Sequence, residues 1–320
     1  MVMIHPEVGI NMAIFAMFFA ILSTELMAAS AFIFRYSEAE KKVTKYIIPI
    51  WEITGTFFVF YAVNLEALIP EIIPFVAYTF VAYILVFLIL YVLRNASIIS
   101  AEFIWKNRRI DRKLLYRAYS VITYVLGVIV LIIYTSVISG VGIDFPARTF
   151  NLASFVSFLP NDGFIIGSAV LLFGMASIYY ALDVNRFLSL AVVLIGMVIA
   201  GVSYIHLGDV VHPYFLTIPV VLTIAAPIMQ FSRKTEKFVH NKIAFQGLIA
   251  VSVFFLAYSA YPYLLGRTLN ILTILNNSAM QTQVFYTTIV GGLILLALSV
   301  MYFDVYMKKG ERGDIESTEA

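Results

Sequence analysis

Residues 46–70 read YIIPIWEITGTFFVFYAVNLEALIP, an apolar stretch that carries two carboxylates, Glu52 and Glu66. The stretch is long enough to cross a bilayer as one helix, since about 20 apolar residues suffice. At about 100° per residue, both acids fall on one narrow helical face, whose members are Glu52, Gly55, Thr56, Val59, Val63 and Glu66. A charge that faces lipid at mid-depth costs about 2.5 kcal/mol or more. We therefore expect this face to point at protein or water.

The composition of the whole chain is that of a membrane protein. Of 320 residues, 62% are hydrophobic and 12% are charged, whereas a soluble domain of this length has about 25% charged residues. The apolar segments are longer than barrel strands, so we expect an all-α, polytopic membrane protein. The net charge of +2 indicates no nucleic-acid partner. The sequence has no cysteine, which excludes disulfides, thiolate metal sites and iron–sulfur ligation.

Nine apolar segments are predicted to cross the bilayer as helices. They cover residues 9–34, 46–69, 71–94, 115–140, 163–182, 186–205, 213–231, 243–263 and 281–307. Alternate connectors, together with the C-terminus, hold 19 of the 21 Lys and Arg residues, and the other connectors hold only Arg148 and Arg267. By the positive-inside rule, the N-terminus is outside and the C-terminus is cytoplasmic. We predict a single transmembrane domain over residues 1–310 and a polar, disordered cytoplasmic tail over 311–320.

Two connectors also carry structural signals. The third span can continue as a helix through Arg94 to about Trp105, beyond the hydrocarbon on the cytoplasmic side. Residues 145–158 place apolar side chains so that a short helix can lie on the outer surface. No soluble domain, Gly-rich phosphate loop or clear internal repeat is evident in the sequence.

Carboxylates at membrane depth are the sharpest functional signal. Glu25 lies nine residues from the inner end of the first span and Glu52 six from that of the second, or roughly 13 and 9 Å deep. Two desolvated acids on neighbouring helices can each alternate between neutral and charged forms and so pass protons. Glu66 and Thr56 extend the same face of the second span. The alternative is that these acids are ion-paired or permanently protonated and hold helices together.

Two further positions near these acids are candidates for a role. Trp51 is adjacent to Glu52 and can shape the apolar pocket of that acid. Glu102 lies beside many cations at the cytoplasmic end of the third span. With Arg94 upstream of it, we predict an ion pair at the surface or at a contact between subunits.

The histidines indicate neither a haem nor a metal site. No two of the four histidines lie at bilayer depth on different predicted helices, so a haem held by two histidines of this chain is not expected. Methionine ligands stay open as an alternative. His206 and His212 frame Asp209 at a spacing that could ligate a metal, but the run ends at Pro213 on the predicted outer surface. We interpret it as an interfacial loop.

Four short motifs follow one another along the chain. They are Thr24-Glu25-Leu26-Met27; Pro49-Ile50-Trp51-Glu52; Arg94 followed by Ala101-Glu102-Phe103; and Tyr261–Leu265 (YPYLL) with Leu272-Thr273, Asn276, Ser278 and Thr282 before the last span. Together with nine spans of matching polarity, they resemble subunit II of the cytochrome bd-type quinol oxidases over nearly the whole chain. The corresponding family patterns are G-F-D-M-G, P-x-W-D, R-G-V-A-F-E-F-R and YPYLLP…LT…S…TL.

The chain also departs from the family patterns. Glu replaces Asp at both acids, and the spacing from Arg94 to Glu102 is three residues longer. The glycines around the first acid are absent, and residues 53–57 replace a polar Asn-Gln-x-Trp run. A divergent member of the family, such as an archaeal one, fits this combination.

The resemblance implies an accessory subunit of a quinol:oxygen oxidoreductase that itself carries no redox centre. Haem b and haem d would belong to a haem-bearing subunit I, with which this chain would form a heterodimer in a prokaryotic plasma membrane. Quinol would be the substrate of the complex, and Glu52 and Glu25 would line a cytoplasmic proton entry path. A structural quinone is compatible with the resemblance, but no cofactor-binding residue of this chain can be named from it.

Two other functions use the same residues. A proton-coupled secondary transporter could employ the intramembrane acids, and it would show inverted repeats and helices broken near the midplane. Pro219 and Pro227 could break the seventh span, but no matching partner segment is evident. A purely structural membrane scaffold would tolerate neutral substitution of both acids.

Overall fold

The computed structural model describes residues 5–105, 108–275 and 278–316. Over this part the chain is helical apart from two short hairpins. The helices are α1 (Pro6–Phe34), α2 (Tyr36–Lys42), α3 (Thr44–Leu68), α4 (Ile72–Thr79), α5 (Val81–Ile99), the π-helix η1 (Ser100–Ile104), α6 (Arg109–Ser139), α7 (Leu152–Val156), α8 (Leu159–Tyr179), α9 (Arg186–Ile205), the 3₁₀ helix η2 (Pro213–Leu216), α10 (Thr217–Met229), α11 (Arg233–His240), α12 (Lys242–Tyr258), α13 (Ile271–Ile274) and α14 (Ser278–Glu316). The antiparallel hairpins pair β1 (Ile143–Asp144) with β2 (Thr149–Phe150) and β3 (Tyr263–Leu264) with β4 (Leu269–Asn270).

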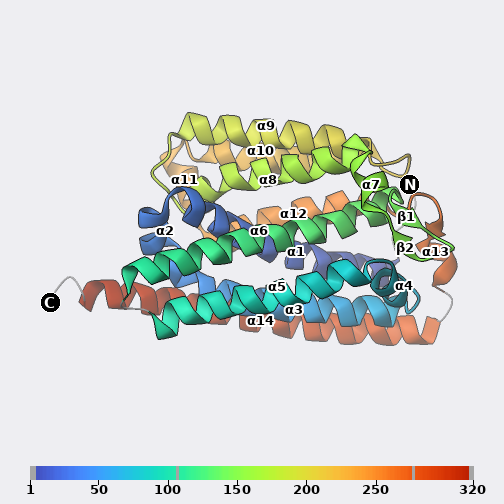
Figure 1. Ribbon diagram of the computed structural model, residues 1–320, viewed down its shortest axis with the longest axis horizontal. Coiled ribbons are helices and arrows are strands. Elements are labelled where there is room, and N and C mark those ends of the chain that lie inside the picture. Colours follow the sequence, from blue (N-terminus) through green and yellow to red (C-terminus); the bar gives the residue numbers. More distant parts are fainter. Residues whose placement is uncertain (1–4, 106–107, 276–277, 317–320) are drawn as a thin grey trace.

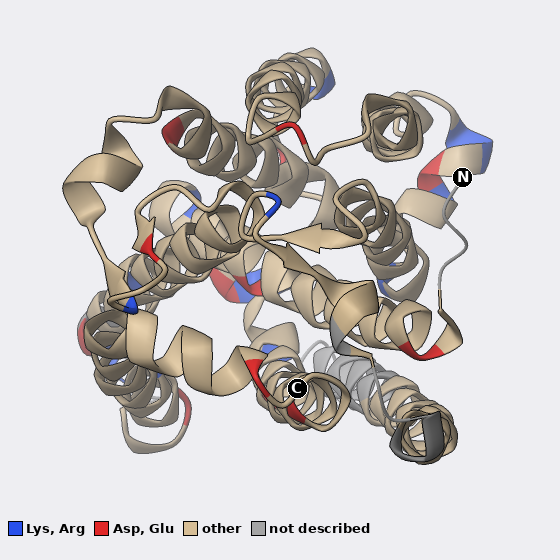
Figure 2. Cartoon of the chain, turned by 90° about the vertical axis from the view of Figure 1, so that its right-hand side faces the viewer, with Lys and Arg blue, Asp and Glu red and all other residues tan. Residues whose placement is uncertain are grey.

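The long helices run side by side along the longest axis of the molecule, with the two ends of the chain at opposite ends of the bundle (Figure 1). Helix α1 is the central element, because it contacts α3, α6, α8, α12 and α14. Two thirds of its most apolar window is buried (67%), against 6% for α14. Figure 2, which looks along the bundle, shows that Lys, Arg, Asp and Glu occupy little of the helical ribbon. The all-α prediction is confirmed.

Helices α8 and α9 are the most closely packed pair. A methyl group added to Gly167 would lie 2.3 Å from the backbone nitrogen of Ala200, and one added to Gly196 would lie 2.3 Å from that of Leu171. Small residues at such positions let two helix backbones approach within a membrane, where dispersion contacts and hydrogen bonds drive association.

Seven helices are long and apolar enough to cross a membrane: α1, α3, α5 with η1, α6, α8, α9 and α14. An eighth is formed if α10 and α11, which bend by 117° at a short break, count as one span. Helix α12 is apolar but has only 17 residues. The nine predicted segments are largely helical, although residues 71–94 form two helices and residues 259–263 follow the end of α12. The described residues support seven or eight crossings. The count of nine and the orientation of the termini stay predictions.

The third predicted span differs in detail from residues 71–94. It divides at Phe80, whose backbone dihedrals (φ −108°, ψ 21°) leave the helical region, so that α4 and α5 are separate helices. Helix α5 then passes Arg94 and continues through η1 to Ile104, which confirms the predicted extension toward Trp105. Arg94 therefore lies inside a helix rather than in a cytoplasmic connector.

The two hairpins repeat one local structure at the end of the bundle near the N-terminus (Figure 1). The sequences Arg148-Thr149-Phe150-Asn151 and Arg267-Thr268-Leu269-Asn270 each run through a second strand to an asparagine that caps a short helix. In place of the helix predicted over 145–158, the chain forms β2 and then α7. The turn of the second hairpin binds the end of α6, because Leu265 and Gly266 donate backbone hydrogen bonds to Val137 and Ile138.

The tail predicted over residues 311–320 is helical as far as Glu316, where α14 ends. Residues 317–320 lie outside the described part, as do Lys106 and Asn276, which the charge count and the C-terminal motif used.

Candidate functional site

A buried ion pair joins α1 to α5 inside the helical bundle. The Glu25 side chain is 3% exposed and that of Arg94 is 2% exposed, and Nη2 of Arg94 donates to Oε1 of Glu25. Removing two charges from water costs several kcal/mol per ion, and their attraction offsets this cost only when further hydrogen bonds are made. The two charges therefore need further hydrogen bonds or other contacts from the surrounding side chains.

Aromatic and polar groups surround the guanidinium of Arg94. Its carbon lies 5.2 Å from the ring centre of Tyr91 and 5.9 Å from that of Tyr119, within cation–π range. Nη1 of Arg94 donates to Oδ1 of Asn95 at 3.2 Å. Its Nε is buried and has no hydrogen-bond partner among the described residues. The guanidinium of Arg94 therefore contacts one carboxylate, one amide oxygen and two aromatic faces, and its Nε lacks an acceptor among the described residues.

Residues of α3 and of the end of α8 border the carboxylate side of the pair. Thr54 of α3 lies beside Glu25, and its hydroxyl donates to the carbonyl oxygen of Ile50 at 2.7 Å. From the end of α8, the hydroxyl of Tyr180 donates to the carbonyl oxygen of Thr24 at 3.0 Å, directly before Glu25 in α1. Four helices therefore meet at Glu25.

Glu52 lies elsewhere, on the exposed side of α3. It lines an open groove between α3 and α14, with a volume of about 440 Å³. Thr56 lines the same groove, and its hydroxyl donates to the carbonyl oxygen of Glu52 at 2.9 Å. Helices α1 and α3 do pack together, as expected for neighbouring helices. Glu25, however, faces Arg94 of α5, and no hydrogen bond or ion pair between described residues joins it to Glu52.

The acidic face of α3 is exposed at five of its six positions, and Gly55 is half-buried. Val59 and Val63 are 60% and 61% exposed, and Glu66 is exposed as well. Trp51 is half-buried and packs against the main hydrophobic core. Because the polar positions Glu52 and Glu66 lie along an otherwise apolar exterior, water or another protein must meet this face in a membrane.

Glu102 belongs to a second polar network, at the end of the bundle where α2 lies. It accepts a hydrogen bond from Nη2 of Arg112 at 3.0 Å and another from the hydroxyl of Tyr116. Nη1 of Arg112 also lies 3.6 Å from Glu40, so α2, η1 and α6 are joined. The ion-pair partner of Glu102 is Arg112, and Arg94 instead pairs with Glu25.

Sequence reasoning did not find the pairing of Arg94 with Glu25. A usable signal was present, since Arg94 is a cation in the apolar run ILYVLRNASII and such a residue requires an anionic partner at the same depth. The length of the third span was the obstacle. With the span ending at Arg94 the guanidinium reaches the interface, whereas the extension of the helix to Ile104 places it inside the bundle.

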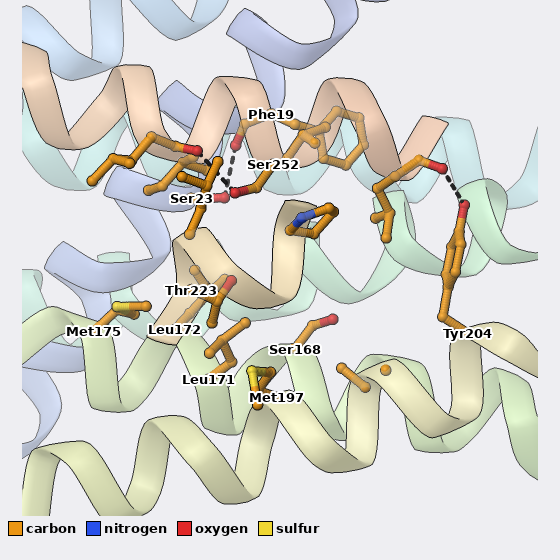
Figure 3. A pocket seen from close by; sticks show the side chains of 18 of the residues that line it. Phe19, Ser23, Ser168, Leu171, Leu172, Met175, Met197, Tyr204, Thr223 and Ser252 are labelled. Carbon is orange, nitrogen blue, oxygen red and sulfur yellow. Dashed lines mark hydrogen bonds between the residues drawn. The ribbon is translucent and has the colours of Figure 1, made fainter. Parts of the chain in front are cut away.

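A separate apolar cavity of about 210 Å³ lies among α1, α6, α8, α9, α10 and α12. Figure 3 shows Leu171, Leu172, Met175 and Met197 along one side of it. Polar groups that line it already make hydrogen bonds within the protein. Ser23 donates to the carbonyl oxygen of Phe19, and Tyr204 donates to that of Leu256. The cavity suits an apolar molecule. Among the described residues, no three His, Asp or Glu side chains gather to hold a metal ion.

These features define a class, a multi-pass helical membrane protein with a charged pair inside its bundle. Comparison of the sequence with models of protein families and with curated proteins finds no match. Comparison of the structure finds a bd oxidase from Geobacillus thermodenitrificans, with a TM-score of 0.70 and 18% sequence identity. The likeness covers 94% of this chain and 98% of that chain. The chain therefore has a bd-oxidase-like fold.

Proposed function

We propose that this chain is the accessory, subunit II-like component of a bd-type quinol:oxygen oxidoreductase and a divergent member of that family, such as an archaeal one. The observation that carries the proposal is the fold likeness over almost the full length of both chains. The four motifs that resemble the family add to it. Haem b, haem d and the oxygen chemistry belong, in this proposal, to a haem-bearing subunit I, and quinol is the substrate of the complex in a prokaryotic plasma membrane.

The exposed face formed by α3, α5 and α14 supports a partner within the membrane. In the most apolar windows of these helices, only 33%, 22% and 6% of the residues are buried. Glu52 and Thr56 lie in the groove on this face, where lipid alone would leave the carboxylate without a partner. We assign the face to the haem-bearing subunit.

In this proposal the carboxylates serve proton entry from the cytoplasm, with separate roles. Glu52 lies in the open groove that the partner would close, and Glu25 lies in the bundle beside Arg94. Glu66 is a weaker candidate on the same face as Glu52. Glu52→Gln is expected to slow oxygen consumption by the complex at least tenfold while haem content stays normal, and exposed Glu71→Gln is the control. Oxygen consumption that is unchanged in Glu52→Gln contradicts the role of Glu52.

Purification of the native complex tests the assembly itself. A tagged chain, isolated from its own membrane in mild detergent, should bring down a haem-bearing polypeptide whose visible spectrum shows haem b and haem d bands. Isolation of the chain without any haem-bearing partner rejects the proposal. The apolar cavity supports one addition, a structural quinone with its isoprenoid tail among the α1, α8 and α12 side chains, which solvent extraction of the purified chain would detect.

The alternative function is a proton-coupled secondary transporter. The bend of 117° between α10 and α11 is the observation that favours it. However, the break follows Met229 and leads into the charged helix α11 (RKTEKFVH), so it lies at the end of the apolar segment and not at its middle. Uptake of a solute by proteoliposomes that contain this chain alone would favour the transporter.

A further inference from the structure

Lys242 is a buried cation that the proposed function does not use. It is the first residue of α12, directly before the apolar segment 243–263, and it is 9% exposed. Its ammonium lies over three tyrosine rings, at 4.2 Å from the ring centre of Tyr179, 5.1 Å from that of Tyr180 and 5.4 Å from that of Tyr46. No carboxylate in the described part of the chain forms an ion pair with it. We call these three rings the tyrosine cage.

The charged groups around the cage are mainly cationic. Lys42 on α2, Lys45 on α3 and His240 on α11 act electrostatically on Lys242 or are influenced by it. The nearby carboxylates already have partners, since Glu38 binds Lys42 and Glu236 binds Arg186.

Burial, together with the positive charges of Lys45 and Lys42, lowers the pKa of Lys242 to about 7. The charge of this ammonium therefore changes within the neutral pH range.

A single side chain links the cage to the buried ion pair. The ring of Tyr180 is one wall of the cage, and its hydroxyl donates to the carbonyl oxygen of Thr24 at 3.0 Å. The next residue of α1 is Glu25, whose carboxylate binds Arg94. Tyr180 and Glu25 are buried, so water and salt screen a charge at Lys242 only weakly along this path.

We propose that Lys242 is a positioning residue that sets the proton affinity of Glu25 through the tyrosine cage and Tyr180. A charged Lys242 favours the carboxylate form of Glu25. A neutral Lys242, which has released its proton to water at that end of the bundle, favours the protonated form. The structural link to Glu25 consists of the contacts of Tyr180 with Lys242 and with Thr24. The use of this effect in proton entry rests on the proposed function, where it would raise the proton affinity of Glu25 as the cytoplasmic pH rises.

The test is a pH titration of the Glu25 carboxyl stretching band by infrared spectroscopy, on the full chain in nanodiscs. Glu25→Gln should remove the band and Glu25→Asp should shift it, which together assign it. Lys242→Arg keeps a permanent charge and Lys242→Met removes it, with Lys242→Gln as a second neutral variant in case the methionine variant does not fold. Lys41→Met, an exposed lysine at the same end of the bundle, is the control.

The neutral variants should protonate Glu25 at a pH about one unit higher than Lys242→Arg, because a weakly screened positive charge favours the carboxylate form. The wild-type protein should follow the arginine variant below pH 7 and the neutral variants above it. Equal midpoints in the charged and neutral variants overturn the proposal, as does a Glu25 that never protonates. So does an equal shift in Lys41→Met.

The readout needs no oxygen consumption, so it separates the two proposals. If the chain isolates without a haem-bearing partner while the midpoints still diverge, the proposed function fails and the role of Lys242 stands. If the midpoints coincide in a chain that does bring down haem, only the role of Lys242 fails.

Discussion

At the scale of single residues, the pairing of Glu25 with Arg94 is the most consequential contact in the chain. Both side chains are nearly inaccessible, and they come from positions 69 residues apart. The two partners differ in one respect that can be measured. A carboxyl group left alone in an apolar bundle can take up a proton and become neutral, whereas a guanidinium cannot lose one.

Replacement of each partner in turn should therefore have unequal effects. Glu25→Gln leaves the Arg94 charge unpaired and should lower the free energy of unfolding by about 3–5 kcal/mol. Arg94→Met should cost less, because Glu25 then becomes protonated, and the double variant should be more stable than Glu25→Gln alone. Thermal unfolding of the detergent-solubilised chain measures this order. Glu66→Gln, on the exposed face of α3, is the control, and equal losses in both single variants would contradict the argument.

At the scale of helices, the contact of α8 with α9 depends on side chains that are absent. Gly167 and Gly196 each face backbone atoms of the opposite helix, while Gly201, also on α9, has open space in front of it. The same change of glycine to alanine should therefore lower stability at Gly196 and preserve or raise it at Gly201.

Gly196→Ala should lower the thermal midpoint by several degrees, because the new methyl group meets the backbone of Leu171 and forces the helices apart. Gly201→Ala should leave the midpoint unchanged or raise it, since alanine is favoured over glycine in a helix by about 0.5–1 kcal/mol. Thermal unfolding in detergent distinguishes the two. Similar losses for both variants would mean that the close approach does not limit stability.

The connector α2 is fastened to the turn after α8 by Glu38. This carboxylate accepts hydrogen bonds from Lys42 and from the backbone N–H of Asp183, both at 2.7 Å. Although burial opposes the shift, these two hydrogen bonds and the nearby charges of Lys42 and Arg35 lower the pKa of Glu38 below its usual value. The stabilisation is then present above the unfolded pKa of about 4.3 and is lost as the pH falls through the folded pKa.

Glu38→Gln should therefore destabilise the chain by about 1 kcal/mol at pH 7. The difference from the wild-type protein should shrink as the pH falls below the ordinary glutamate pKa and through the lower folded pKa of Glu38, because the wild-type carboxyl group then also becomes neutral. Thermal midpoints measured across this range, with exposed Glu71→Gln as the control, check the prediction. A difference that persists at acid pH would assign the effect to packing.

At the scale of the whole molecule, burial is distributed unequally around the bundle. Helix α1 is enclosed, while the face formed by α3, α5 and α14 stays open and carries Glu52 in its groove. Helix α9 also has exposed apolar side chains, such as Val202 at 55%, but they do not line the groove that holds Glu52. The two surfaces should respond differently to a bulky substitution if only one of them binds a partner.

Val63→Trp should reduce the haem that co-purifies with the chain at least tenfold, because a large ring at a 61% exposed position would keep the partner from closing over α3. Val202→Trp is the matched control and should leave the recovered haem unchanged. Haem absorbance per tagged chain gives the comparison. Equal recovery from both variants would move the partner contact away from α3.

The sequence by itself determined the class and much of the layout of this protein. Apolar runs of about 20 residues require helices in a membrane, because no other open structure satisfies the backbone hydrogen bonds there. Each predicted span is accordingly largely helical, although the third divides into α4 and α5. The positions of Glu25 and Glu52 on adjacent packed helices also followed from hydropathy and chain order.

Only the tertiary structure decided which groups meet. Hydropathy does not report the rotation of a helix about its axis, and that rotation turns Glu25 toward Arg94 and Glu52 toward the α14 groove. The helix continues from α5 through η1 to Ile104, which places Arg94 inside the bundle at the depth of Glu25. The start of α12 places Lys242 in the tyrosine cage. These contacts join different helices, as Glu25 and Arg94 do across 69 positions of the chain, so they depend on packing that no local pattern encodes.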